Sequence, residues 1–149
     1  MIALAIFALP ICIADVKYHR IPNIYLTWMF YITAIERIFI GTTSINTFFS
    51  ASIVLLTLYG VAGIGMGDVK LVLLICLTLD FQVIVHFWIF ICAIFACASI
   101  MVLLEFLLSG RIRREIALAP AIFMATALYL GARISGFLQE YAHALVNSW

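Results

Sequence analysis

Two aspartates, Asp15 and Asp68, are the residues of this chain best suited to acid–base chemistry. Each stands at the edge of an apolar segment, where a carboxylate is costly and suggests a function. Two apolar segments, residues 24–40 and 47–64, separate them, so one helix would leave Asp15 and the next would return to the same end. Two carboxyls that meet in a low dielectric share one proton. Such a pair titrates as a unit and can activate water and protonate a carbonyl oxygen without a metal or covalent nucleophile.

Glycines precede the second aspartate. Gly65 and Gly67 lack side chains, so the backbone before Asp68 can approach a neighbouring helix or a substrate strand. A helix that begins at or just after Asp68 would favour the ionised carboxylate through the partial positive charge of its N-terminus.

A structural interpretation of the same acids stands beside the catalytic one. Acids at helix ends often cap the helix or pair with cations at the membrane surface. Asp15 is close in sequence to Lys17 and Arg20, and Asp68 is close to Lys70. Two roles are open for Lys70: it either favours the ionised form of the nearby acid or lies among lipid headgroups. Spacing alone does not decide between these interpretations.

The elements that must position the acids are apolar over most of the chain. Of the 149 residues, 67% are hydrophobic and 10% charged, whereas about a quarter of a soluble domain is charged; the mean hydropathy is +1.25. This pattern predicts one all-α domain, residues 1–149, built as a polytopic membrane bundle of about six transmembrane helices. The predicted apolar segments are residues 1–14, 24–40, 47–64, 71–79, 83–108 and 116–137. The fourth is too short to span a membrane at about 1.5 Å per residue, so its helix should extend past Asp80 or into the preceding loop.

Basic residues are divided unevenly between the predicted loops. With the N-terminus outside, the inner side holds Lys17, Arg20, Lys70, Arg111, Arg113 and Arg114, and the outer side holds Arg37 and Arg133. Lysine and arginine collect on the cytoplasmic side of short loops. The sequence therefore predicts a multi-pass protein of the cytoplasmic membrane with its N-terminus outside and both aspartates near the cytoplasmic face.

The remaining features indicate contact with lipid and packing. The arginine cluster at 111–114 is predicted to face anionic lipid, and residues 138–149 have the spacing of an amphipathic helix in the outer interface. A net charge of +1 leaves no basic surface for nucleic acid. Cys12, Cys76, Cys92 and Cys97 lie inside apolar runs without a C-x-x-C pair. We expect them to be packing residues, and we expect no metal site.

Three motifs together resemble one protease family. Asp15 is followed, after four residues, by Arg20-Ile21-Pro22-Asn23, and the second aspartate lies in Gly65-Met66-Gly67-Asp68-Val69-Lys70-Leu71. In order and in position after apolar helices, these strings resemble the signature of the type IV prepilin peptidases, membrane aspartic proteases of the G-x-G-D class. Residues 117–121, Ala-Leu-Ala-Pro-Ala, are similar to the proline-containing start of the family's last helix. The resemblance covers nearly the whole chain.

The resemblance implies a six-helix endopeptidase that removes the basic leader from prepilins or pseudopilins at the cytoplasmic face. Asp15 and Asp68 would be its catalytic pair, and the supporting motif residues would be Arg20, Pro22, Asn23, Gly65, Gly67, Lys70 and Pro120. We expect the loop residues to shape the first inner loop and Pro120 to lie in the first turn of the last helix. The compact form is more similar to the short peptidases of Flp-type pili. Because the paired C-x-x-C segment of long-form relatives is missing, we expect no cofactor and no methyltransferase activity.

Three other functions fit parts of the pattern. A presenilin-like intramembrane protease shares the G-x-G-D motif, but Asp15 lacks the preceding tyrosine, and the Arg20–Asn23 string is not part of that pattern. A small proton-coupled carrier would use the two aspartates as a relay and would transport without cleaving. A structural assembly subunit would tolerate Asp68→Asn.

Overall fold

The structure is a computed structural model that describes residues 2–41, 44–110 and 117–146, with the side chains of 40, 62, 109 and 137–146 excluded. These residues form helices and no strand, which confirms the prediction of an all-α fold. The helices are α1 (Ile2–Tyr18), α2 (Asn23–Ile40), α3 (Ile45–Ala62), α4 (Met66–Leu79), α5 (Ile84–Ser109) and α6 (Ala119–Val146).

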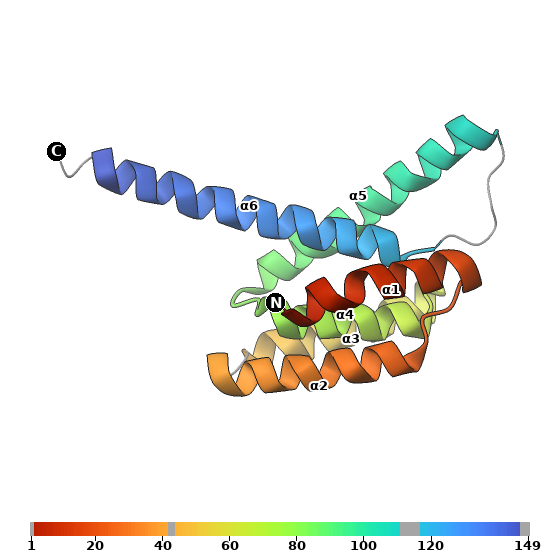
Figure 1. The fold of residues 1–149 in the computed structure, drawn as a ribbon, viewed down its shortest axis with the longest axis horizontal. Helices are drawn as coiled ribbons and strands as arrows, with labels where there is room; N and C mark the ends of the chain where they lie inside the picture. Colours follow the sequence, from red (N-terminus) through yellow and green to blue (C-terminus); the bar gives the residue numbers. More distant parts are fainter. Residues whose placement is uncertain (1, 42–43, 111–116, 147–149) are drawn as a thin grey trace.

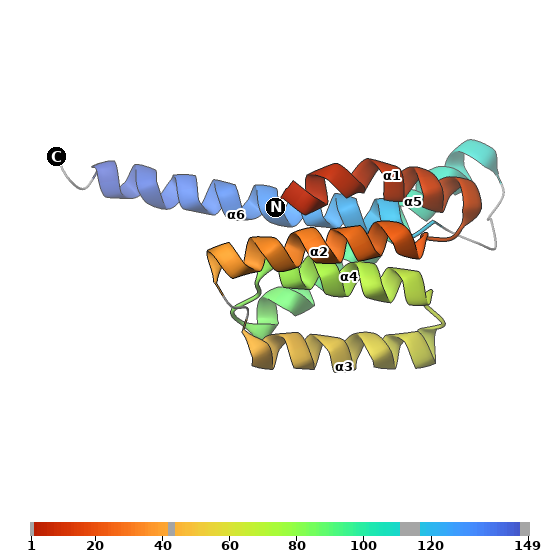
Figure 2. The same ribbon diagram turned by 60° about the horizontal axis from the view of Figure 1, so that its bottom comes forward.

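Successive helices run in opposite directions (Figure 1). One end of the bundle therefore gathers the C-terminal ends of α1, α3 and α5 and the N-terminal ends of α2, α4 and α6. We call it the aspartate end, because Asp15 and Asp68 lie there; the opposite end holds Gly41, Ser44 and the connection 80–83. Helix α4 is central, between α2 and α3 in Figure 2, and it contacts both of these helices and α6.

The central position of α4 explains its sequence. Its buried residues include Val69, Leu71, Ile75 and Leu79, which together face more than one direction around the helix. An apolar helix without a polar face is expected where neighbours cover it on several sides. At the opposite end, an aromatic cluster holds the chain that follows α4. The ring centroid of Phe81 lies 5.6 Å from that of Phe90 and 5.3 Å from that of Tyr129.

The first helix is longer than its apolar segment. We predicted an apolar stretch ending at residue 14, but α1 continues to Tyr18, so Asp15 lies inside the last helical turn. Loss of hydropathy does not end a helix; a change of backbone conformation does. His19 adopts a left-handed conformation with φ 48°, and its N–H donates to the carbonyl oxygen of Asp15 at 2.8 Å, which is the αL motif that terminates helices.

The fourth helix extends in one of the two directions that we considered. It begins at Met66, five residues before the predicted apolar segment, and it ends at Leu79. It does not pass Asp80, because that residue has φ 52° and terminates the helix in the left-handed conformation. The loop glycine motif therefore belongs to the first turn of α4, and Asp68 is the third residue of the helix.

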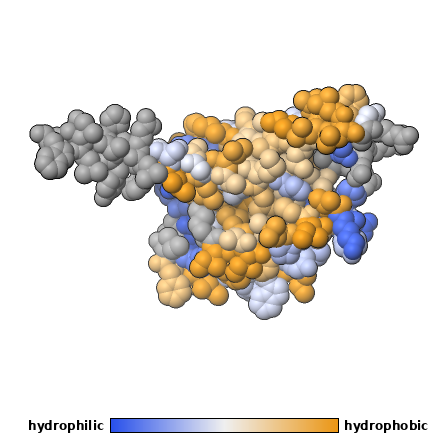
Figure 3. Space-filling view, turned by 45° about the horizontal axis from the view of Figure 1, so that its top comes forward, coloured by the Kyte–Doolittle hydropathy of each residue, from blue (hydrophilic) through white to orange (hydrophobic). Residues whose placement is uncertain are grey.

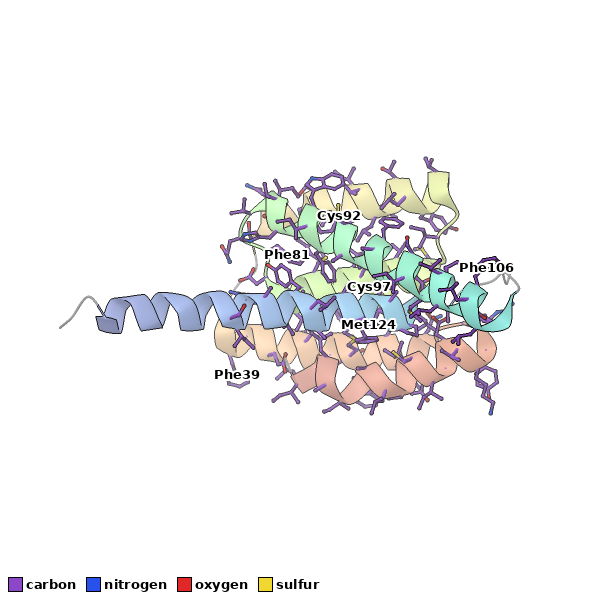
Figure 4. The ribbon with its side chains drawn as sticks, turned by 90° about the horizontal axis from the view of Figure 1, so that it is seen from above. Phe39, Phe81, Cys92, Cys97, Phe106 and Met124 are labelled. Carbon is purple, nitrogen blue, oxygen red and sulfur yellow. The ribbon has the colours of Figure 1, made fainter. Side chains whose placement is uncertain are left out.

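The last helix begins at Ala119 and runs without a break to Val146. The prediction began this segment at residue 116, which lies outside the described residues, as do Arg111, Arg113 and Arg114. Residues 138–146 continue α6, and the C-terminal half of the helix extends beyond the other helices (Figures 1 and 4). Side chains from residue 137 onward lie outside the description, so the amphipathic tail at 138–149 stays a prediction.

The surface between the two ends is largely apolar. Figure 3 shows one face on which hydrophobic residues predominate and hydrophilic residues gather toward the ends. Among the described residues, one helix is long and apolar enough by itself to cross a membrane, at Ile84–Leu108 in α5. All four cysteines are free: Cys76 and Cys97 are buried, as expected of packing residues, whereas Cys92, on α5, is exposed (Figure 4).

Candidate active site

Asp15 links the first helix to the last. Its side chain is 5% exposed, and its Oδ2 accepts a hydrogen bond of 2.8 Å from the backbone N–H of Ala119, which is 104 residues away in the sequence. Ala119 is the first residue of α6 and is fully buried. The carboxylate of one helix therefore caps the N-terminus of another.

The local sequence explains why α6 needs this partner. The first turn of a helix has N–H groups without acceptors inside the helix, and buried ones need an acceptor elsewhere in the protein. The N–H of Ile122 bonds to the carbonyl oxygen of Leu118, so Leu118 occupies the N-cap position, and its aliphatic side chain cannot accept a hydrogen bond. Pro120 has no N–H and lies in the first turn, where we expected it. Asp15 supplies the acceptor that the N-cap residue lacks.

Asp68 is held in the first turn of α4. Gly65 is the N-cap residue, and its carbonyl oxygen accepts a hydrogen bond of 3.0 Å from the N–H of Asp68. A Cβ atom at position 65 would lie 2.8 Å from Oδ2 of Asp68. A side chain at position 65 would therefore displace the carboxyl group of Asp68 from the place it occupies.

The two aspartates influence each other electrostatically. Asp15 is the charged group that repels the carboxylate of Asp68. Oδ1 of Asp68 is buried and has no hydrogen-bond partner among the described residues. A buried carboxylate oxygen without a donor, under the influence of a second anion, is unfavourable. An arrangement of this kind can hold one proton between two carboxyls and can act on a water molecule as acid and base.

The two sequence motifs meet beside the aspartates. A Cβ atom at Gly67 would lie 3.3 Å from Cβ of Ile21, so α4 approaches the α1–α2 connection closely at a position without a side chain. One turn further, the Nζ of Lys70 donates to Oδ1 of Asn23 at 3.4 Å. Pro22 is the N-cap residue of α2. These contacts hold the start of α2 against the start of α4.

Most of the supporting residues take part in the local structure around the aspartates. Asn23, Gly65, Gly67 and Lys70 lie in the contacts above, and Pro22 and Pro120 lie at the starts of α2 and α6, whereas Arg20 is exposed in the connection and has no such contact among the described residues. In the part of the chain that the structure describes, neither aspartate forms an ion pair with Lys17, Arg20 or Lys70. Simple interfacial charge pairs therefore do not explain the two acids in the described residues.

A polar cluster at the opposite end has a structural role. Arg37 pairs with Asp80 at 3.5 Å and donates to the carbonyl oxygen of Thr78 at 2.7 Å. The amide of Gln82 donates to the same aspartate at 2.8 Å. These bonds satisfy the C-terminal end of α4 and hold it to α2. Within the described ranges, no three His, Cys, Asp or Glu side chains are grouped as metal ligands would be.

An apolar groove of about 390 Å³ lies between α2, α3 and α4. Asn23 and Lys70 line one end of it, and Leu73 and Leu77 line its floor on α4. Helical spacing places these α4 residues on the side away from Asp68. The groove therefore does not open directly onto the aspartates.

Sequence reasoning missed two participants. The backbone N–H of Ala119 is invisible to a motif search for reactive side chains, and Ile21 appeared only as part of a string. A signal for the first did exist: a helix with Pro120 in its first turn and no Ser, Thr, Asp or Asn before it as a cap needs an acceptor from elsewhere. The sequence did not show which acid would supply it.

Comparison with protein families gives a match. The sequence profile of the type IV leader peptidase family matches residues 2–104, which include α1 to α4, most of α5 and both aspartates. No curated protein and no solved structure gives a significant match.

Proposed function

Because the chain belongs to the type IV leader peptidase family, we propose that it is an aspartic endopeptidase that cleaves the basic leader from prepilins or pseudopilins. Asp15 and Asp68 are the proposed catalytic pair, and Flp-type prepilins are the first substrates to test. The observation that carries the proposal is the position of these two acids at one end of the bundle, where the charge of Asp15 acts on Asp68.

The proposed chemistry needs one proton and one water molecule. The ionised carboxylate of the pair takes a proton from water while the water oxygen attacks the scissile carbonyl carbon. The protonated carboxyl donates its proton to the carbonyl oxygen, which gives a tetrahedral diol. When the C–N bond breaks, the first carboxyl passes its proton to the leaving amine, and the diol returns a proton to the second. The pair is then restored, with one proton shared as before.

The proposed setting is the cytoplasmic membrane. The exposed side chains along the helices are mostly large hydrophobic ones, for example Leu9, Ile38, Phe39 and Leu108. Of the described basic residues, Lys17, Arg20 and Lys70 belong to the aspartate end, whereas Arg37 and Arg133 lie toward the opposite end. The positive-inside rule then assigns the aspartate end to the cytoplasm and the N-terminus to the outside. A precursor whose apolar helix lies in the bilayer would present its leader at this end.

The proposal is tested by cleavage in cells. The chain is co-expressed with an Flp-type prepilin, a larger prepilin and a pseudopilin, and leader removal is followed by gel mobility and by sequencing the new N-terminus. Asp15→Asn and Asp68→Asn should each abolish processing, because an amide provides neither the base nor the shared proton. Both variants should still insert into the membrane.

Asp80→Asn is the matched control. It is the same substitution on an acid that follows α4 at the opposite end, and asparagine tolerates the left-handed conformation that Asp80 adopts. Processing should continue in this variant. Normal processing by Asp15→Asn or Asp68→Asn would reject the pair, and transport without cleavage would favour a carrier.

A further inference from the structure

We propose that the N-terminus of α6 is a positioning element that makes Asp15 the ionised member of the pair, so that Asp15 is the general base and Asp68 the general acid. This inference rests on the proposed function for its chemistry. Its physical basis is the hydrogen bond from the Ala119 N–H to Asp15, together with the absence of such a donor at Oδ1 of Asp68 among the described residues.

The environment of Asp15 favours a negative charge. A charge-assisted hydrogen bond from a backbone N–H is stronger to a carboxylate than to a neutral carboxyl. The donor is also the first N–H of a helix, where the partial positive charge of the helix dipole is located. Both effects act at short range, since the bond is 2.8 Å long and buried.

The environment of Asp68 favours a proton. The N-terminus of α4 also favours a charge on Asp68, but the N–H of Asp68 itself bonds to the carbonyl oxygen of Gly65, and no described donor reaches its buried Oδ1, whereas Asp15 has the Ala119 N–H. Protonation of one carboxyl removes the repulsion between the two acids. A protonated Asp68 also has the O–H donor that an acid catalyst needs.

Few other ionisable groups act on Asp15. Cys12, on the same helix, interacts electrostatically with it, as does Asp68 on α4. The first two turns of α6, residues 119–126, contain no ionisable side chain. In the first two turns of α2, Tyr25 is the single residue with an ionisable side chain. Lys17 and the other polar residues after Asp15 are exposed. The N–H of Ala119 is therefore the one hydrogen-bond donor seen at this carboxylate within the described residues.

A single substitution removes the donor. Ala119→Pro deletes the N–H at a helix position where proline is well tolerated. Ala119→Val is the matched control, because it adds similar volume at this buried site and keeps the N–H. The measurement is the pH profile of kcat/KM for leader cleavage by the purified full-length protein in lipid nanodiscs, which reports the acid and base of the free enzyme.

The inference predicts which limb of the profile moves. Without the hydrogen bond the base is protonated more readily, so the acidic limb of Ala119→Pro should shift to higher pH by about one unit or more. The basic limb of Ala119→Pro should remain at the pH of the wild type, and both limbs of Ala119→Val should do the same. Movement of the basic limb alone would make Asp15 the acid. An even loss of rate with both limbs unchanged would make the contact structural only. Either result overturns the assignment.

A second measurement does not depend on activity or on the folding of Ala119→Pro. In protein labelled with [¹⁵N]alanine, the Ala119 amide signal is identified by its loss in Ala119→Val. It should move upfield in Asp15→Asn, change little in Asp68→Asn, and follow the lower of the two titration steps of the pair. A signal that follows only the upper step contradicts the inference. If wild-type protein cleaves no prepilin, the proposed function fails, and this spectrum still decides the charge of Asp15.

Discussion

Asp68 depends on Gly65 for the space that its carboxyl group occupies. The backbone of Gly65 has φ −59°, which alanine adopts without strain, so the conformation itself does not require glycine. What depends on glycine is the carboxyl position, because a Cβ atom at residue 65 would lie 2.8 Å from Oδ2 of Asp68. The position of the Asp68 carboxyl group therefore depends on the lack of a side chain at residue 65.

Gly65→Ala should separate activity from stability. The carboxyl of Asp68 must rotate away from the new methyl group, and a displacement of about 1 Å at a reacting group can lower the rate about 100-fold. We expect kcat for leader cleavage to fall about 10- to 100-fold. The apparent melting temperature should stay or rise slightly, because alanine restricts the unfolded chain more than glycine does.

Gly60→Ala serves as the control for this change. Gly60 lies inside α3, and no atom would come within 4 Å of its Cβ. Alanine should stabilise the helix by about 0.5–1 kcal/mol and leave cleavage unchanged. Full activity in Gly65→Ala would show that the carboxyl position seen here is not the one used in catalysis.

At this level the sequence allowed the reactive side chains to be predicted but not their partners. Asp15 and Asp68 were recognisable because carboxylates at the edges of apolar segments are rare and costly. The Ala119 N–H could not be recognised in this way, because every residue except proline has a backbone N–H. Its role as a donor to Asp15 appears only when α6 is placed against α1. Similarly, no rule of sequence spacing could relate Gly67 to Ile21, since their contact depends on how closely two helices approach.

Packing between α2 and α4 includes a buried pair of threonines with unequal roles. Their hydroxyl groups lie 3.4 Å apart, and both side chains are buried. Thr78 has a second partner, the carbonyl oxygen of Leu74 at 2.8 Å, whereas Thr33 has Thr78 alone among the described residues. The two positions should therefore respond differently to the loss of a hydroxyl.

Valine substitutions test this asymmetry, because valine has the shape of threonine without the oxygen. Thr33→Val leaves Thr78 satisfied and should cost less than about 0.5 kcal/mol. Thr78→Val leaves the Thr33 hydroxyl buried without a partner and should cost about 1–3 kcal/mol. The double variant should recover most of that loss. Thermal unfolding in nanodiscs measures the stability of the two single variants and the double variant. Equal effects of the single variants would contradict the hydrogen-bond assignment.

Helices as elements could be predicted more accurately than their ends. Hydropathy located all six, because an apolar segment of suitable length must form a helix in a low dielectric. It failed at the end of α1 and at the start of α4, where polar or glycine residues continue the helix. These two errors fall at the proposed site: Asp15 and Asp68 lie inside helices, which fixes their direction more firmly than a loop would.

The alternating path of six helices determines which residues of the whole molecule share an end. Because each connection reverses the chain, the starts of α2, α4 and α6 are neighbours (Figures 1 and 2). Counting segments was enough to predict that Asp15 and Asp68 lie at the same end of the bundle. It was not enough to predict that α4 would be central, because all the apolar segments are similar in composition.

Orientation in the membrane is the prediction that belongs to the whole chain. The basic residues described at the aspartate end predict that this end faces the cytoplasm. In a variant without the four native cysteines, single cysteines are placed at Tyr18, which is exposed at the aspartate end, and at Asn46 or Gln82, which are exposed at the opposite end. A membrane-impermeant maleimide applied to spheroplasts should label Asn46→Cys and Gln82→Cys at once, and Tyr18→Cys only after lysis. The reverse pattern would place the aspartates outside, where a cytoplasmic leader does not reach them. That result would exclude leader cleavage at the cytoplasmic face even if both acids proved essential.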